Sequence, residues 1–471
     1  MIEFVWGKII GTQVIFAGEE YNWQESKYVE AQKAFHGEYL ETYYFPQEEG
    51  ILFVGTGKED LTNVTILKEL MAKACKTLKQ TRIYQFSILM DRILEENDAS
   101  VLTACTEGIC LGLYEAPTYK SQQEEKEFQV SVIGIPGKDL ERAKQCVAEG
   151  AVITEAITFA REMVNRPGNK LRPADFAEEI QKLVKDTNVE IEIVTVDEMR
   201  KLEMGALLAV GESSAYPPYL VILRYRGEPL KKEITALVGK GVTCDTGGYC
   251  LKPASGMAGI RGDMAGAAAV AGAVYALAKR KEKVNVTAVM PLCENRISSG
   301  SFLPGDVITS YSGKTIEIGN TDAEGRLILA DAVTYAIHHE RATRILDIAT
   351  LTGAVVNMLG FSIAGVLCDD HGLWQEFEAA SEKSGEKYWL LPFGREHEKM
   401  IESDVADIKN IGGSVCGTIT AGLFIRAFAE GLPWIHLDIA GTAWTETPLY
   451  EFQNKYATGT AAETIYYWLK R

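Results

Sequence analysis

The sequence has few of the features that would place a protein in a membrane or on a nucleic acid. Its longest apolar runs, Met264–Ala278 and Thr352–Cys368, are shorter than the ~18–20 residues that a membrane-spanning helix needs. The first residues, MIEFVWGK, contain no basic stretch before an apolar core, so we expect no signal peptide. A formal net charge of −17 disfavours binding to phosphate backbones. We therefore expect neither a membrane nor a nucleic acid as a partner.

Cysteine pairs and histidine pairs with metal-binding spacing are also missing. The 9 cysteines form no CxxC pair and their number is odd, which is typical of reduced thiols in a cytoplasmic protein. The 6 histidines form no HExxH, and His338-His339-Glu340 cannot place two imidazoles on one helix face. A bound metal would therefore depend mainly on carboxylates.

The pattern of strands and helices predicts an α/β protein with two domains and a helix between them. In residues 1–137, short apolar strands alternate with helical stretches, as in a small α/β domain. A continuous helical pattern over residues 138–165 predicts a linker helix. Residues 166–471 alternate strand and helix, which favours a mostly parallel central sheet that is covered on both faces.

The larger domain contains most of the predicted elements. Strands are expected at Ile191–Val196, Leu220–Arg226, Thr235–Val238, Val284–Val289, Thr315–Ile318, Arg344–Ile348, Gly365–Leu367 and Trp434–Asp438. Helices are expected at Ala174–Val184, Met264–Arg280 and Leu327–Glu340. Functional sites in such sheets lie beyond the carboxyl ends of the strands.

The segment VGKGVTCDTGGYCLKPASGMAGIRGD, over residues 238–263, places charges where that rule predicts a site. Lys240 follows a strand directly, and Asp245 and Lys252 flank a glycine-rich turn. Asp263 opens a helix rich in alanine and glycine. We expect these side chains to converge at one edge of the sheet.

A second charged segment, GNTDAEGR at residues 319–326, follows the predicted strand over residues 315–318. Asp322, Glu324 and Arg326 succeed one another at a spacing of two. Two bare carboxylates in one turn would repel each other and raise the pKa of one of them. Either a divalent cation or the counter-charges of Arg326 and the two lysines of the first segment would relieve this repulsion.

Together the two segments supply enough carboxylates for a site with two metal ions. Asp245, Asp263, Asp322 and Glu324 could hold two divalent cations ~3.5–4 Å apart, and oxygen ligands suit Mg²⁺, Mn²⁺ or Zn²⁺. A single such aspartate is most often a turn or cap residue, but their occurrence at successive strand ends favours a metal site. Such a site would activate a water and polarise a carbonyl or a phosphoryl oxygen, so a peptidase and a two-metal phosphoesterase both remain open here.

At these residues the sequence resembles the leucyl aminopeptidase family, the cytosol aminopeptidases. NTDAEGRL at Asn320–Leu327 and GKGVTCDTGGYCLKP at Gly239–Pro253 are similar to the two site motifs of the family, and Asp263 lies eleven residues after Lys252, as its pattern requires. Weaker similarities lie in NRPGN, DIATLTGA, SDVADIKN, GTITAGLF, HLDIAGTAW and KYATG, so that the resemblance runs from Asn165 to the C-terminus.

The resemblance implies an enzyme that hydrolyses the N-terminal residue, leucine or another apolar residue, from peptides by means of a metal-bridging water. It also implies a macro-like N-terminal domain, a cytoplasmic homohexamer and two divalent ions per chain, zinc or manganese. Some members of the family also bind DNA, and the negative net charge of this chain makes a DNA-binding or regulatory role the weaker alternative.

The resemblance also implies roles for single residues. Lys240, Asp245, Asp263 and Glu324 would hold the tightly bound ion, and Asp245, Asp322 and Glu324 the exchangeable one, to which the α-amine of the substrate would bind. Lys252 would donate to the scissile carbonyl oxygen as negative charge develops there. Arg326 would hold a bicarbonate that acts as the general base.

The expected substrate pocket consists of Ile260, Asn320, Thr350, Leu351 and Gly353. Three positions depart from the common family pattern. Cys244 stands where phenylalanine is common, Thr246 where serine is common, and Ile260 where many members have a methionine in the pocket. We expect an apolar pocket nevertheless, with Cys244 as a small buried packing residue.

Overall fold

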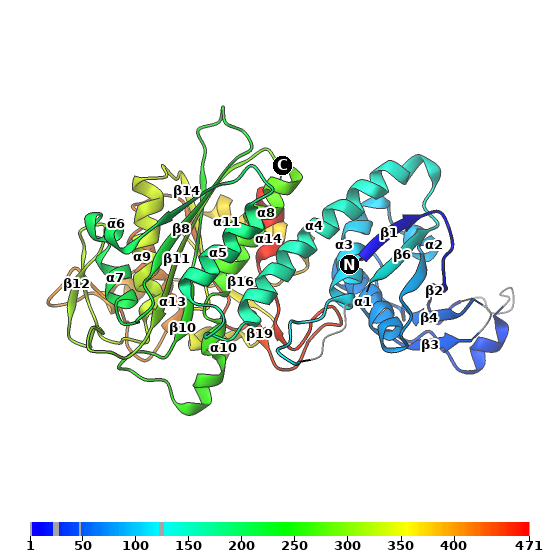
Figure 1. The fold of residues 1–471 in the computed structure, drawn as a ribbon, viewed down its shortest axis with the longest axis horizontal. Helices are drawn as coiled ribbons and strands as arrows, with labels where there is room; N and C mark the ends of the chain where they lie inside the picture. The colour runs from blue at the N-terminus through cyan, green and yellow to red at the C-terminus, as the bar shows by residue number, and fades with distance from the viewer. Residues whose placement is uncertain (1, 22–27, 47–48, 122–126, 471) are drawn as a thin grey trace. The chain divides into compact units, whose positions relative to one another are not determined.

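The chain divides into two compact units. The structure is a computed structural model that describes residues 2–21, 28–46, 49–121 and 127–470 (Figure 1). One unit comprises the chain up to Thr154 together with Pro448–Asn454, and the other comprises Glu155–Thr447 and Lys455–Arg471. This division falls inside the long helix α4, Leu140–Asn165. The boundaries at residues 137 and 165 assign that helix to a linker, and they stay a prediction.

The N-terminal unit is built on a six-stranded sheet. Its strands, in spatial order, are β1 (Ile2–Trp6), β6 (Phe128–Ile133), β5 (Gln85–Leu89), β2 (Thr12–Ala17), β4 (Ile51–Gly55) and β3 (Thr42–Phe45). All neighbouring pairs are parallel except β3 with β4. Its helical segments are η2 (Val29–Lys33), α1 (Val64–Gln80), α2 (Asp91–Leu94), η3 (Ala99–Val101), α3 (Leu102–Leu113) and η4 (Gly137–Asp139).

A late segment of the chain completes this unit. Glu451, in the segment Pro448–Asn454, places Oε1 3.2 Å from Nζ of Lys73 on α1. The carbonyl oxygen of Gln453 accepts a hydrogen bond from Nζ of Lys76 at 3.1 Å. Helices α1 and α3 pack against each other, and Asn63 caps α1 by accepting a hydrogen bond from Thr65 N at 2.9 Å.

The larger unit has a sheet of nine described strands. The spatial order is β16 (Tyr388–Leu390), β15 (Ala364–Cys368), β18 (Trp434–Asp438), β14 (Arg344–Ala349), β9 (Thr235–Gly239), β11 (Asn285–Asn295), β8 (Tyr219–Arg226) and β7 (Glu190–Val194), with β10 (Gly241–Asp245) paired to β11. Five ladders are parallel and three are antiparallel. This mixed, mostly parallel sheet confirms the predicted α/β class.

Helices cover both faces of this sheet. α8 (Ala265–Arg280) and α9 (Glu324–His338) both contact β9, β11 and β14 and lie on opposite sides of them (Figure 1). The small residues of α8 allow the close approach, because a Cβ on Gly266 would lie 2.2 Å from the carbonyl oxygen of Ile348. The other helices of this unit are α5 (Pro173–Val184), α6 (Val196–Lys201), α7 (Gly205–Gly211), η5 (Ala254–Gly262), α10 (Gly353–Leu359), α11 (His371–Ser384), α12 (Arg395–Glu398), η6 (Lys399–Ile401), α13 (Gly417–Arg426) and α14 (Ala462–Leu469).

One predicted strand does not belong to the central sheet. Residues 315–317 form β13 (Thr315–Glu317), which pairs with β12 (Val307–Thr309) and β17 (Ile408–Lys409) in a separate three-stranded sheet. The segment is a strand as predicted, but its assignment to the central sheet was wrong, because it hydrogen-bonds to a local antiparallel neighbour. A two-stranded sheet of β19 (Trp444–Thr445) and β20 (Tyr456–Ala457) completes the unit. In the described ranges, no helix combines the length and the apolar character needed to cross a membrane.

Candidate metal centre

The charged residues of the two segments come together at the carboxyl ends of β9, β10 and β14. Lys240 stands between β9 and β10, and Asp245 is the last residue of β10. Asp263 lies between η5 and α8. Asp322 lies in the loop before α9, and Glu324 is the first residue of that helix, three residues earlier than the predicted helix start. The expected convergence at one edge of the sheet is therefore what the structure shows.

Lys240 is buried among carboxylates. Its Nζ lies 2.7 Å from Asp263 Oδ1 and Oδ2 and 2.9 Å from Glu324 Oε1, and it donates a hydrogen bond to the carbonyl oxygen of Thr350 at 3.2 Å. Burial alone would lower the pKa of Lys240, but the charges of Asp263 and Glu324 outweigh it and raise this pKa.

Lys252 faces the other half of the cluster and is less buried. Its Nζ lies 2.7 Å from Asp245 Oδ2 and forms a short ion pair with Asp322. The side chain remains 24% exposed, against 4% for Lys240. Burial opposes the charge of Lys252, but the neighbouring carboxylates raise its pKa above the ordinary value. Of the two lysines, Lys252 is thus the one that solvent or a ligand can reach.

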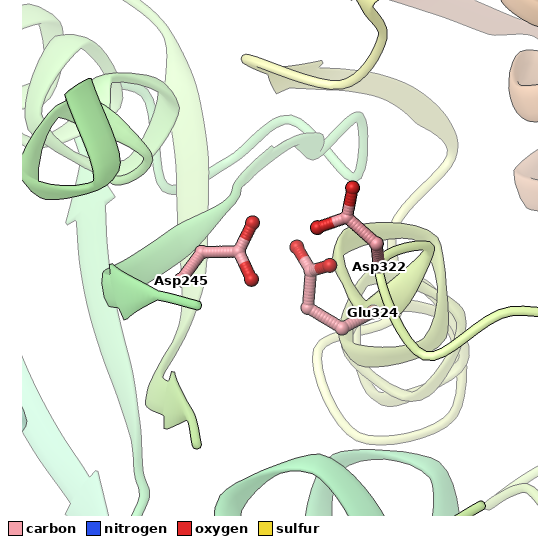
Figure 2. A group of neighbouring side chains, drawn as sticks. All are labelled: Asp245, Asp322 and Glu324. Carbon is pink, nitrogen blue, oxygen red and sulfur yellow. The ribbon is translucent and has the colours of Figure 1, made fainter. Parts of the chain in front are cut away.

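The carboxylates crowd one another closely enough to share a cation. One oxygen each from Asp245, Asp322 and Glu324 lies within 4.8 Å of the others, and Figure 2 shows the three groups pointing toward a common centre. Burial, reinforced by the charge of Glu324, raises the pKa of Asp245 to about 6. Burial also raises the pKa of Asp263 well above its usual value. Glu324 Oε2 is buried without a hydrogen-bond partner among the described residues. This set of crowded oxygen donors, one of them without a partner, fits a hard or borderline divalent cation.

Arg326 offers a buried cation next to this cluster. Its Nη1 donates to the carbonyl oxygen of Asn410 at 2.9 Å, and its Nε has no hydrogen-bond partner within the described ranges. Burial lowers the pKa of Arg326 to about 10, an effect that the charges of Glu324 and Asp438 partly offset. A buried guanidinium with an unused donor is suited to an anion.

Two asparagines fix the loops that carry the carboxylates. Asn295 Nδ2 donates to Asp245 Oδ1 at 2.9 Å and to the carbonyl oxygen of Thr321 at 3.0 Å. Asn410 Nδ2 donates to the carbonyl oxygen of Asn320 at 2.7 Å. Asn320 Oδ1 in turn accepts from Asp322 N at 2.8 Å. Asn295 and Asn410 were not predicted as site residues, because nothing in their local sequence shows which distant loops they reach.

These groups line one pocket with a volume of about 470 Å³. It is lined by all the predicted ligand and catalytic residues, Lys240, Asp245, Lys252, Asp263, Asp322, Glu324 and Arg326. It is also lined by four of the five predicted pocket residues, Asn320, Thr350, Leu351 and Gly353. The fifth, Ile260 on η5, is not among the lining residues.

Several walls of the pocket were missed from sequence, among them Thr352, Val356, Thr420, Ala440, Ala443 and Trp444. All of them except Val356 lie in the stretches DIATLTGA, GTITAGLF and HLDIAGTAW, which were the only signal for them, and Val356 lies two residues beyond the first stretch.

Asp438, at the end of β18, holds the wall that follows β14. Its Oδ2 accepts from Thr352 Oγ1 at 2.6 Å, and its Oδ1 accepts from Leu351 N at 3.2 Å. Thr350 Oγ1 donates to Asp263 Oδ1 at 2.8 Å. The same short loop therefore contacts both the carboxylate cluster and the core of the sheet.

Two of the three positions that depart from the common family pattern, Cys244 and Thr246, have local contacts that accommodate them. Cys244 is buried, and burial raises the pKa of its thiol to about 11, which disfavours the reactive thiolate. Thr246 Oγ1 donates to the carbonyl oxygen of Asn295 at 2.9 Å. Neither departure removes a group from the cluster.

Comparison with known proteins places the chain in one family. The model of the cytosol aminopeptidase family, catalytic domain, matches residues 158–466, and that of the N-terminal domain matches residues 24–123. A probable cytosol aminopeptidase of Clostridium perfringens is 40% identical over 422 residues, which cover 89% of this chain and 85% of the relative. Another, of Treponema denticola, is 38% identical and covers 94% of each chain.

Solved structures agree with these matches. The bottromycin maturation enzyme BotP is similar with a TM-score of 0.87 and 30% identity, over 97% of this chain and 98% of that one. The same enzyme in complex with Mn gives a TM-score of 0.88. The chain therefore belongs to the cytosol aminopeptidase family and is a metal-dependent aminopeptidase, a hydrolase of the exopeptidase class.

Proposed function

We propose that the chain removes single apolar N-terminal residues, leucine among them, from peptides by means of two divalent cations, zinc or manganese. The observation that carries this proposal is the convergence of Asp245, Asp322 and Glu324 within 4.8 Å of one another. The manganese complex of the similar BotP structure supports manganese. The family matches do not favour the two-metal phosphoesterase alternative.

The buried residues would divide between two cation positions. Lys240, Asp245, Asp263 and Glu324 would hold one ion, and Asp245, Asp322 and Glu324 the other. Lys240 would bind as the neutral amine, and neighbouring cations favour that form. Bound there, the cations would lower the pKa of a water and polarise the scissile carbonyl.

Two other side chains would act on the substrate and on the proton. Lys252, the more exposed lysine of the cluster, would donate from Nζ to the carbonyl oxygen as negative charge develops there. Arg326 would hold a bicarbonate through its buried guanidinium, and this anion would accept the proton of the attacking water. The unpartnered Nε of Arg326 supports that role.

The test of this function is an activity assay with controlled metal content. The purified protein should hydrolyse leucine p-nitroanilide, lose this activity in a chelator and regain it with Mn²⁺ or Zn²⁺. p-Nitrophenyl phosphate should remain intact under the same conditions. If no divalent metal supports amide hydrolysis, or if the phosphate ester is the better substrate, the proposal is wrong.

The proposal extends to the assembly and the compartment. By its resemblance to the family, the chain would form a cytoplasmic homohexamer. Light scattering should then give a mass about six times that of the 51.8 kDa chain, and cell fractionation should find the protein with cytoplasmic markers. A stable monomer would contradict the hexamer without affecting the assigned chemistry.

A further inference from the structure

A cluster of two cations and two aromatic rings lies beside the pocket; we call it the rim cluster, and it consists of Arg261, Trp444, Lys455 and Tyr456. Arg261 Cζ lies 5.1 Å from the centroid of the Trp444 ring and 5.7 Å from that of Tyr456. The two rings are 4.9 Å apart, and Lys455 Nζ lies 5.1 Å from the Tyr456 ring. Both positive charges therefore lie near the Tyr456 ring.

The charge of Arg261 is not neutralised by an acid. No carboxylate of the described residues forms an ion pair with Arg261, and its buried Nε has no hydrogen-bond partner among them. The chain has 65 acidic residues for 48 basic ones, so an arginine without an acidic partner is not explained by a shortage of acids. Contact with aromatic rings does not use the N–H donors of the guanidinium, which lie in its plane.

The rim cluster adjoins the metal centre. Arg261 lies on η5, two residues before Asp263, and two residues span at most ~7 Å of chain. Gly259, Gly262 and Trp444 line the pocket, while Arg261 lies next to it, against Trp444, and is not itself among the lining residues. A group bound by Arg261 would therefore lie within the length of a short peptide from the carboxylate cluster.

This geometry points to a second recognition element for the substrate. We propose that Arg261, assisted by Lys455, binds a carboxylate on the leaving-group side of the scissile bond. The chain would then prefer dipeptides and tripeptides with a free C-terminus. The proposal rests on the aminopeptidase function proposed above. Its chemical basis is that a guanidinium matches a carboxylate with two parallel hydrogen bonds.

The test compares a dipeptide with its own amide. In the wild type, kcat/KM for Leu-Gly should exceed that for Leu-Gly amide by about fivefold, as expected for a partly exposed charge pair. Arg261→Gln should bring this ratio close to one, and Arg261→Lys should restore part of it. The wild-type ratio should also fall at high salt. Leu-Gly-Gly and Leu-Asp amide show whether the C-terminal carboxylate or an acidic side chain is the group bound.

A matched control removes another arginine charge. Arg200→Gln, on α6, where Arg200 pairs with Asp197 and Glu212 and not with the rim cluster, should keep the wild-type ratio. If Arg261→Gln lowers kcat/KM for the acid and the amide equally, Arg261 only supports Trp444 and the proposal is overturned. Calorimetry of both peptides with the Lys252→Ala variant gives a readout that needs no turnover, and equal affinities would also overturn it. If the wild type hydrolysed none of these peptides or amides, the proposed function itself would be refuted instead.

Discussion

At the scale of single residues, Glu324 is shared by both proposed cation positions. It is buried, its Oε1 lies 2.9 Å from Lys240 Nζ, and its Oε2 is without a partner among the described residues. Glu324→Ala should remove a shared ligand, so we expect the loss of at least one ion per chain and a fall in kcat of more than about 100-fold. Elemental analysis of the purified variant together with initial rates measures both. Two ions retained per chain would refute the assignment.

A variant of Lys252 tests catalysis independently of metal binding. Lys252 has no ligand role in the proposal, so Lys252→Ala should keep both ions. The variant should lose kcat by ~10²–10³-fold, because a donor to the developing negative charge is removed. KM should change little. Unchanged kcat in a fully loaded variant would show that the assigned role is wrong.

The identities of the clustered side chains were predictable, but their pairings were not. The charges of Lys240, Asp245 and Asp322 stand next to predicted strand ends or glycine turns, and parallel strands bring such ends together. Which lysine would face which carboxylate depends on the route of η5 and of the loop before α9. Those routes are set by contacts such as Asn295 with Asp245, fifty residues apart, which no local pattern encodes.

At the scale of elements, the strands of the central sheet were the most predictable part. β9, β14 and β18 are rich in apolar residues and are buried along almost their whole length, as expected for strands covered on both faces. The short strand β13 was misplaced because three residues with partial burial carry no information about their partner. Helix α9 begins at Glu324 and not near Leu327. The earlier start was not predicted because Ala323, at the N-cap position, has no side chain that could cap a helix.

Asp331 on α9 connects three elements and should make stability depend on pH. Its carboxylate accepts from Leu207 N of α7 and from Tyr311 N, each at 2.8 Å. Burial raises its pKa from 3.8 to about 7, although the backbone donors oppose this. The folded protein thus keeps a proton that the unfolded chain releases near pH 4. The stabilisation associated with that proton is complete below about pH 4 and is lost as the pH rises through 7.

The variant Asp331→Asn isolates this contribution. Because asparagine cannot ionise, the melting temperature of the variant should fall less between pH 5 and pH 8 than that of the wild type. One backbone N–H should lose its acceptor, which costs about 1–3 kcal/mol. Calorimetric scans of both proteins at the two pH values measure the difference, in which groups common to both cancel. An equal pH dependence would contradict the prediction.

At the scale of the whole molecule, net charge decides between partners. With a net charge of −17 and a pI of about 5.0, the chain should repel a polyanion at moderate salt. A gel-shift titration with duplex DNA at ~150 mM salt should show no complex up to micromolar protein. A retarded band that weakens steeply with added salt would revive the DNA-binding alternative.

The segment Pro448–Asn454 belongs to the N-terminal unit, so this unit cannot be completed until nearly the whole chain has been synthesised. The ribosome finishes the rest of that unit at Thr154 but delivers this last piece roughly 300 residues later, or about 15–60 s at ordinary translation speeds. Until then Lys73 cannot form its ion pair with Glu451, and Lys76 cannot donate to the carbonyl oxygen of Gln453. A nascent N-terminal unit is therefore incomplete for most of translation, and a gene cut after codon 154 would encode a piece that never receives its closing segment.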